Sequence, residues 1–136
     1  MKLKLIKSLL LTGLLSMVAS VSVFAADAPK IIDVKQVSSL QKSGSLLIDV
    51  REVDEYAEAH VAGSTLIPLG QLQQRLQELG TDKSKPIVLI CRSGRRSEKA
   101  QSILEQAGFS ATSNVEGGMI AWQKAALPVV TGSASR

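Results

Sequence analysis

The sequence predicts an α/β sandwich in which a mainly parallel sheet carries helices on both faces. Short apolar runs alternate with amphipathic helical patterns along most of the chain, which is the order expected of βα units. The runs at 46–50 and 87–90 are almost continuously apolar, and such runs suit strands that are covered on both faces. Gly80 and Gly108 stand where helices should end. Right-handed crossovers should therefore connect the strands.

Local signals place each element in order. Asp33 with Gln36 three residues later is typical of a capping box and opens a helix that should bury Val34, Val37 and Leu40. Helical spacing of apolar residues indicates two more helices, one with Val53, Tyr56, Ala57 and His60 and one with Leu69, Leu72, Leu76 and Leu79. The expected strands are 31–32, 46–50, 65–67, 87–90 and 113–115. The expected helices are 33–42, 53–60, 69–79, one from about Ser97 to 107, and a last one between Gly118 and Pro128 that contains Ile120, Trp122 and Ala125.

The first 25 residues are typical of a secretory signal peptide. Lys2, Lys4 and Lys7 form a basic start, an apolar stretch from 9 to 24 follows, and small residues lead up to Ala25. We expect cleavage after Ala25, export to the periplasm and no stable membrane insertion afterwards. An uncleaved anchor is the alternative, but the apolar core is shorter than the roughly 20 residues that span a bilayer. The remaining residues form one domain, 26–130, followed by a tail at 131–136 that we expect to be disordered.

Charge and cysteine content narrow the function classes. The whole chain carries a formal charge of +4, but three of its 16 basic residues and none of its 12 acidic ones lie in the leader. The mature chain, with 13 basic and 12 acidic residues, is therefore nearly neutral, and scarce aromatic residues also argue against nucleic-acid binding. The single cysteine, Cys91, cannot form an intramolecular disulfide. An exported protein with one cysteine either pairs it with another chain or uses a reactive thiol.

The stretch from Cys91 to Ser97 favours the reactive thiol. It contains Cys91-Arg92-Ser93-Gly94-Arg95-Arg96-Ser97 and joins a buried strand to a helix. A thiol at a helix N-terminus meets the positive end of the helix dipole and free backbone N–H groups, and three nearby arginines add positive charge. Both effects favour the thiolate, which is the nucleophilic form of cysteine. The same donors would attract an anionic substrate.

Other polar residues receive supporting roles. Asp49 and Arg51 follow the strand at 46–50, so they should lie at the same sheet edge as Cys91. We expect them to pair with each other or to brace the Cys91 loop. A thiolate that the loop stabilises needs no base, so His60 is expected to be structural, and Tyr56 and Trp122 are expected in the core.

Three stretches of the chain resemble the rhodanese (thiosulfate sulfurtransferase) family. They are Asp49-Val50-Arg51-Glu52 with Glu55-Tyr56, His60-Val61-Ala62-Gly63-Ser64 and Ile67-Pro68; the loop Cys91 to Arg96; and Gly117-Gly118 followed by Trp122. Their order over 46–122 makes the match specific. Ala59 and Ser64 stand where the family usually has Gly and Ala, but both lie outside the loop. A short leader with one such domain is similar to the small periplasmic rhodaneses of bacteria.

The resemblance implies a rhodanese-like three-layer sandwich and sulfur transfer through a persulfide on Cys91. Cys91 would attack the outer sulfur of thiosulfate or a similar small anionic donor, sulfite would leave, and a thiol, cyanide or sulfite would accept the sulfur. The implied substrate-binding residues are Arg92, Ser93, Gly94, Arg95 and Arg96, whose backbone N–H groups would face the charged sulfur. No metal or organic cofactor is needed, and one His with one Cys is too few for a usual zinc site.

Several alternatives stay open at this stage. Phosphatase-like loops of this kind need an arginine six positions after the cysteine, where this chain has Ser97. That spacing argues against phosphatase and arsenate reductase activity. A persulfide carrier or sulfide-binding module with little turnover, serving a partner protein, is the main alternative to an enzyme. A purely structural domain is disfavoured by the intact Cys91 loop. Thiosulfate, a mercaptopyruvate-type donor and polysulfide all fit, and the sequence does not indicate the oligomeric state.

Overall fold

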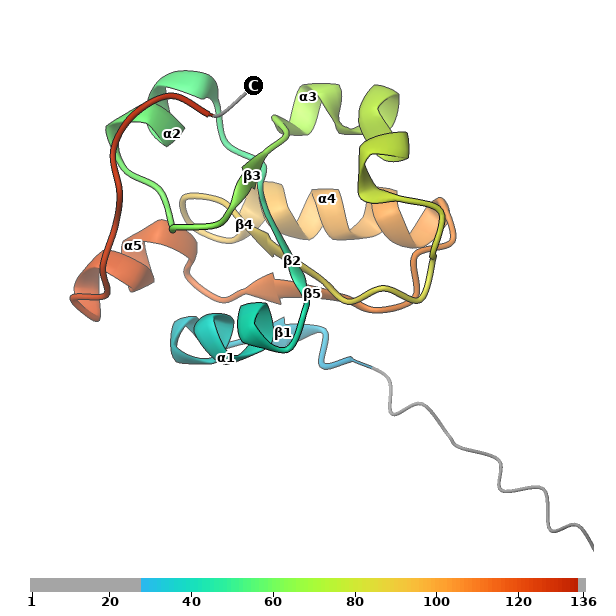
Figure 1. Cartoon of the computed structure of the whole chain (residues 1–136), viewed down its shortest axis with the longest axis horizontal. Coiled ribbons are helices and arrows are strands. Elements are labelled where there is room, and N and C mark those ends of the chain that lie inside the picture. Colours follow the sequence, from blue (N-terminus) through green and yellow to red (C-terminus); the bar gives the residue numbers. More distant parts are fainter. Residues whose placement is uncertain (1–27, 135–136) are drawn as a thin grey trace, which may run out of the picture.

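Five parallel strands form one sheet in the order β1-β5-β4-β2-β3 in the computed structural model, which describes residues 28–134 (Figure 1). The strands are β1 (Ile31–Ile32), β2 (Leu46–Asp49), β3 (Thr65–Leu66), β4 (Ile87–Ile90) and β5 (Thr112–Val115). The helices are η1 (Val34–Gln36), α1 (Val37–Lys42), α2 (Val53–Glu58), α3 (Leu69–Leu72), η2 (Gln73–Leu79), α4 (Arg95–Gln106) and α5 (Gly118–Lys124), with η marking 3₁₀ helices. The predicted α/β sandwich with helices on both faces is confirmed.

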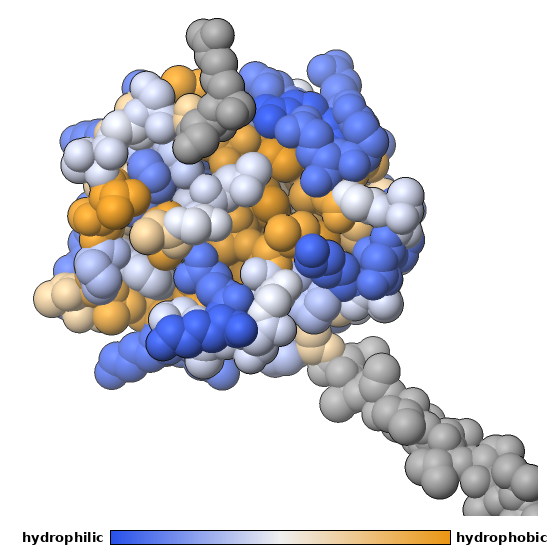
Figure 2. Space-filling model, in the orientation of Figure 1, coloured by the Kyte–Doolittle hydropathy of each residue, from blue (hydrophilic) through white to orange (hydrophobic). Residues whose placement is uncertain are grey.

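Two apolar cores lie on opposite faces of the sheet and make the architecture three-layered. Alternation along β4 shows this directly, because Ile87 and Leu89 belong to one core and Val88 and Ile90 to the other. Helices α3 and α4 cover the first face, and α1 and α5 cover the second (Figure 1). All four residues of β4 are buried, so the continuously apolar run at 87–90 is explained by its central place in the sheet. On the face shown in Figure 2, hydrophilic residues lie mostly around the rim, and apolar residues lie mainly in the middle.

Several boundaries differ from the sequence-based expectation. The Asp33–Gln36 capping box is present as predicted, but the helix at 53–60 ends at Glu58 and leaves Val53 58% exposed. His60 instead forms an antiparallel bridge with Val130, with N···O distances of 2.9 Å in both directions. Pairing with the returning chain therefore satisfies backbone groups that a longer α2 would have bonded internally.

The last three helices also differ in detail. The leucine-rich stretch changes from α-helix to 3₁₀ helix after Leu72, and η2 is itself interrupted by non-helical backbone at Arg75, although the leucines still face the core. α4 begins at Arg95 rather than near Ser97, because Gly94 adopts a left-handed conformation just before it (φ +101°). α5 ends at Lys124, so Ala125 only caps it; its buried residues are Gly118, Met119 and Trp122, whereas Ile120 is 51% exposed.

The chain ends fall partly outside the structure. The predicted signal peptide, 1–25, lies outside the described residues. The tail that the sequence predicted as disordered starts at Thr131, and the structure describes it as far as Ala134, where the Gly132 N–H donates to Ala57 O at 2.8 Å. Between residues 28 and 134, no helix is both long and apolar enough to cross a bilayer.

Candidate active site

Cys91 lies at the carboxyl end of the central strand β4 and is only 1% exposed. Residues 91–94 turn sharply into α4. The turn aims donors back at the sulfur: the Gly94 N–H donates to Cys91 Sγ at 3.1 Å, and the Ser97 hydroxyl lies 3.2 Å from the same atom. The first turn of a helix has free N–H groups for such contacts. The local sequence thus builds a compact set of donors around one sulfur atom.

Hydrogen bonds, more than the arginines, stabilise the thiolate. Burial raises the pKa of Cys91, but donation from the Ser97 hydroxyl and from the backbone of Ser97, Gly94 and Ser93 outweighs it, so the pKa lies below its ordinary value. A low pKa makes the thiolate available as a nucleophile. Sequence reasoning missed Ser97. Its signal was a hydroxyl residue in the first helical turn after the loop, where a side chain can turn back toward the strand end.

The three loop arginines have different surroundings. Arg96 forms a two-pronged ion pair with Glu55 of α2, with both N···O distances 2.7 Å. Arg95 is exposed and lines a separate hollow with Glu98 on α4. Arg92 lines the cavity described below, and no ion pair of Arg92 is found in the described part of the chain. The three predicted arginines therefore do not act as one cluster: Arg96 makes a structural ion pair, Arg95 lies on open surface and Arg92 lines the cavity.

The Glu55–Arg96 pair joins α2 to the active-site helix. Hydrogen bonds from the Arg96 side chain lower the pKa of Glu55, and partial burial of the carboxylate raises it. The first effect is larger, so the pKa falls to about 2. Both side chains are about one-third exposed, so the pair should be worth on the order of 1 kcal/mol. Its role is to hold Arg96 at the edge of the loop.

We expect acid to remove this contribution. Because the pKa of Glu55 is lower in the folded protein than in the unfolded chain, the contribution is present above about pH 4.5 and is lost as the pH falls toward about 2. Glu55→Gln should therefore unfold at lower urea concentration than the wild type at pH 7, and the two proteins should converge at about pH 2. Urea titrations at both pH values measure this difference. A gap that widens in acid would contradict the role of the pair.

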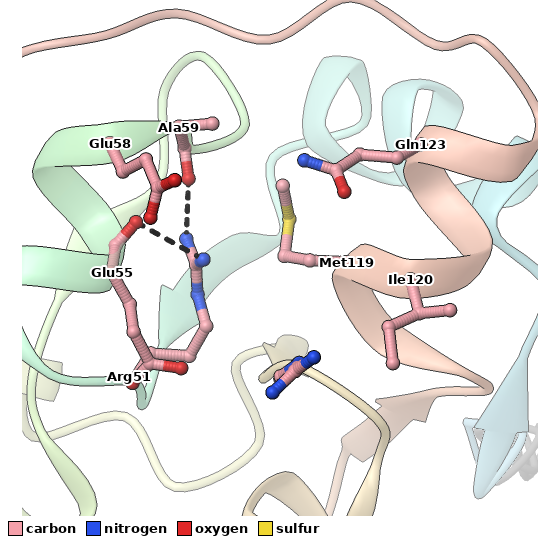
Figure 3. Close-up of a pocket in the computed structure, with 8 residues that line it drawn as sticks. Arg51, Glu55, Glu58, Ala59, Met119, Ile120 and Gln123 are labelled. Carbon is pink, nitrogen blue, oxygen red and sulfur yellow. Dashed lines mark hydrogen bonds between the residues drawn. The ribbon is translucent and has the colours of Figure 1, made fainter.

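Asp49 and Arg51 form the buried ion pair that the sequence offered as one of two alternatives. Arg51 Nη2 lies 2.7 Å from Asp49 Oδ2, and Arg51 Nε donates to both carboxylate oxygens. The guanidinium also donates to the carbonyl oxygens of Glu55 and Ala59 (Figure 3). These bonds satisfy carbonyl groups at the end of α2, which helps to explain why the helix stops there. The pair fixes α2 against β2 at the same sheet edge as Cys91.

The start of α5 supports the Cys91 loop from the other side. The N–H of Met119 donates to Cys91 O at 2.8 Å, and the N–H of Ile120 donates to Arg92 O at 3.0 Å. Gly118 makes this approach possible, because a Cβ there would lie 2.3 Å from Cys91 O. Its φ of +53° is also in the left-handed region. The Gly117-Gly118 motif therefore acts as a close backbone support for the loop.

A cavity of about 600 Å³ lies beside this loop. It is lined by Arg51, Glu55, Glu58, Ala59, Arg92, Met119, Ile120 and Gln123. Arg51, Glu55 and Glu58 lie on one side of it, and Met119, Ile120 and Gln123 of α5 lie on the other (Figure 3). Arg51 and Glu55 are already paired with Asp49 and Arg96, so among the described residues that line this cavity Arg92 is the cation outside an ion pair.

His60 and Tyr56 make contacts with each other and with nearby backbone. Their rings stack with centroids 3.6 Å apart, and His60 Nδ1 is 2.7 Å from Tyr56 O. The Tyr56 hydroxyl donates to Ser64 O at 2.8 Å. Neither residue lines the cavity beside the loop. These contacts support the structural role that the sequence suggested for His60.

Comparisons with known proteins agree with this geometry. The rhodanese-like domain family matches residues 33–125. The chain is 43% identical over 76 residues to Bacillus subtilis YrkF, named as a candidate sulfur carrier protein; the match covers 56% of this chain and 40% of YrkF. It is 35% identical over 85 residues to a sulfurtransferase of Allochromatium vinosum, covering 62% of this chain and 78% of that protein.

A solved structure extends the likeness to three dimensions. The crystal structure of a rhodanese-related protein from Thermoplasma volcanium superposes with a TM-score of 0.66 at 29% identity, covering 75% of this chain and 98% of that one. The parallel sheet, the cysteine at the end of its central strand and the match over 33–125 lead to one conclusion. The chain belongs to the rhodanese family of sulfur-transfer proteins.

Proposed function

We propose that the protein is a sulfurtransferase that carries sulfane sulfur on Cys91. The Cys91 thiolate attacks the outer sulfur of thiosulfate or a similar donor, a Cys91 S–S bond forms, and the donor S–S bond breaks so that sulfite leaves with the electron pair. A thiol, cyanide or sulfite then attacks the outer sulfur of the persulfide, and Cys91 leaves as thiolate. Sulfur is conserved in both steps, and no external oxidant is needed.

The hydrogen-bond geometry at Cys91 carries this proposal. Gly94 and Ser97 place donors 3.1 and 3.2 Å from Sγ, and the pKa of the thiol is lowered. Such donors favour Cys91 both as an attacking thiolate and as a leaving thiolate. Backbone N–H groups from Arg92 to Arg96 are proposed to hold the outer sulfur. Among the arginine side chains, Arg92 is proposed to meet the anionic donor, because it lines the cavity while Arg96 is paired and Arg95 lies on open surface.

A persulfide carrier is the second candidate. The similarity to YrkF favours it, since that protein is named as a candidate sulfur carrier and this chain spans only 40% of it. A carrier would form the same Cys91 persulfide but would release sulfur only to a partner protein. Steady-state turnover with small acceptors therefore separates the two functions.

Export is also part of the proposal and is supported only by the sequence of residues 1–25. The periplasmic fraction of a producing cell should contain a protein whose intact mass corresponds to residues 26–136. A full-length protein retained with the membrane would contradict cleavage after Ala25.

Intact-mass measurement tests the sulfur chemistry. Treatment of the mature protein with thiosulfate should add the mass of one sulfur atom, and later addition of cyanide should remove it. With both substrates present, sulfite and thiocyanate should appear in equal amounts over many turnovers. Loading followed by release only once would favour the carrier. No gain in mass with thiosulfate, polysulfide or 3-mercaptopyruvate would contradict both functions.

A further inference from the structure

Asn114 lies behind the Cys91 loop and contacts the same hydroxyl that donates to the sulfur. It extends from β5, and its side chain lies between Ser97 and the carbonyl of Gly94. Ser97 Oγ is 2.6 Å from Asn114 Oδ1 and 3.2 Å from both Cys91 Sγ and Gly94 O. Asn114 Nδ2 is 3.1 Å from Gly94 O. Ser97 is fully buried, so its hydroxyl depends on these protein groups for its hydrogen bonds.

Hydrogen-bonding chemistry fixes the direction of the contacts. A carbonyl oxygen only accepts, so the side of the Asn114 amide that faces Gly94 O must be its NH₂ group. The amide oxygen then faces Ser97 and also only accepts. The Ser97 hydroxyl must therefore supply its proton to make the 2.6 Å contact. The orientation of the Asn114 amide therefore follows from the chemistry of its partners.

The one hydroxyl proton of Ser97 thus has three acceptors within reach, Asn114 Oδ1, Cys91 Sγ and Gly94 O, and Asn114 Oδ1 is the nearest of them. When Cys91 is a neutral thiol, its S–H can donate to Ser97 Oγ while Ser97 donates to Asn114, so the whole chain is satisfied. When Cys91 is a thiolate, the sulfur accepts only, and Ser97 must turn its proton from Asn114 to Sγ for the charge to be stabilised. The hydrogen bond from Ser97 stabilises the thiolate, but forming it costs the hydrogen bond between Ser97 and Asn114. The net stabilisation of the thiolate is therefore smaller.

We propose that Asn114 is a positioning residue that competes with Cys91 for the Ser97 proton and so limits how strongly the loop stabilises the thiolate. The competition suits sulfur transfer, in which the charge on Sγ comes and goes. Once the persulfide forms, the charge moves to the outer sulfur, and the Ser97 proton can return to Asn114. A thiolate that is stabilised too strongly is a weaker nucleophile, so an upper limit on its stability preserves reactivity.

Charged groups near Cys91 also affect its titration, but they are the same in all the variants compared below. Arg96 is the cation from α4 whose field acts on Cys91, and Glu55 of α2 pairs with it. On β2 the Asp49–Arg51 pair is buried and internally neutral. On the β5 side, Arg95, Glu98 and Glu116 line the surface hollow near Asn114, together with Lys30 and Glu105. These charges remain the same in every variant below, so they do not confound the comparison.

The test is the pH dependence of the thiol in variants at residues 114 and 97. The chain has one cysteine, so ultraviolet thiolate absorbance and iodoacetamide alkylation both report on Cys91 alone. Asn114→Ala removes the nearest competing acceptor and leaves only the more distant Gly94 O, so it should shift the titration midpoint to lower pH. On the acid side of the wild-type midpoint, its alkylation should be about two- to tenfold faster, the range expected of one hydrogen bond. Ser97→Ala should shift the midpoint to higher pH.

The double variant separates this role from a merely structural one. If Asn114 acts through Ser97, Asn114→Ala should have no further effect on the midpoint in the Ser97→Ala background. Asn114→Val, which suits a strand, gives the same readout should the alanine variant fail to fold. A midpoint at higher pH in Asn114→Ala or Asn114→Val, or an unchanged one, would overturn the proposal, because simple loosening of the loop raises the pKa by losing donors.

This inference rests on the proposed function for its purpose but not for its measurement. Thiol titration needs no donor, acceptor or turnover. Absence of persulfide formation together with the expected midpoint shifts would reject sulfur transfer and leave the Asn114 contact established. Persulfide formation with an unshifted midpoint would reject the role of Asn114 alone.

Discussion

Cys91→Ser is expected to abolish sulfur loading and turnover completely. The hydroxyl is nearly the size of the thiol, so the buried site should still pack. A serine hydroxyl at this position would meet the Gly94 N–H and the Ser97 hydroxyl, which do not act as bases, and it cannot form a persulfide, whereas the same donors activate the thiol. Intact mass after thiosulfate treatment should stay unchanged, and thiocyanate formation should fall to the uncatalysed rate.

Two controls make this result specific to the sulfur. Thermal unfolding of Cys91→Ser should resemble that of the wild type, which excludes loss of the fold. Wild-type protein alkylated at its single cysteine should also fail to load. A mass gain in Cys91→Ser would place the accepting group elsewhere in the chain and end the Cys91 assignment.

The fold was predictable because its signals are local or averaged over whole elements. The runs at 46–50 and 87–90 have too few polar residues for a half-exposed strand, and in the structure they are the neighbouring buried strands β2 and β4. The Asp33–Gln36 capping box depends on a spacing of three residues and was also correct. The core position of Trp122 was also predicted correctly, but the sequence did not separate buried Met119 from exposed Ile120, because a seven-residue helix offers few positions for periodicity to compare.

The contacts that tune the site were not predictable, because they join residues far apart in the chain. The sequence showed three arginines near Cys91, but it could not show that Glu55, 41 residues before Arg96, pairs with one of them. Asn114, on strand β5, lies 17 residues after Ser97, which it contacts in helix α4. Proximity in the sequence therefore suggested too large a role for the arginines in stabilising the Cys91 thiolate and too small a role for Ser97. The position of Cys91 at the carboxyl end of a strand was predictable, because the alternation of strands and helices places sites there.

Gly118→Ala is expected to have the second largest effect, because it would push the support of α5 away from the loop. A Cβ at this position would lie 2.3 Å from Cys91 O and 2.7 Å from Arg92 O, far inside normal contact distance, and both obstacles are backbone atoms. Relief requires α5 or the loop to move, which weakens the bonds from Met119 and Ile120 to that loop. A shift of about 1 Å at a reacting group can cost roughly 100-fold in rate. We expect sulfur transfer to fall by that order.

Gly108→Ala is the matched control, since Gly108 also has a left-handed backbone (φ +95°) but nothing within 4 Å of its added Cβ. Backbone strain should cost both variants about 1–2 kcal/mol of unfolding free energy. Gly118→Ala should lose more than Gly108→Ala, because its Cβ also clashes with the backbone of the loop. Only Gly118→Ala should also lose sulfur transfer and shift the Cys91 titration toward higher pH, because only there does the methyl group meet the active-site backbone. Urea unfolding and turnover, measured on the same samples, separate strain from displacement. Equal turnover in the two variants would mean that the loop keeps its shape without the close approach of α5.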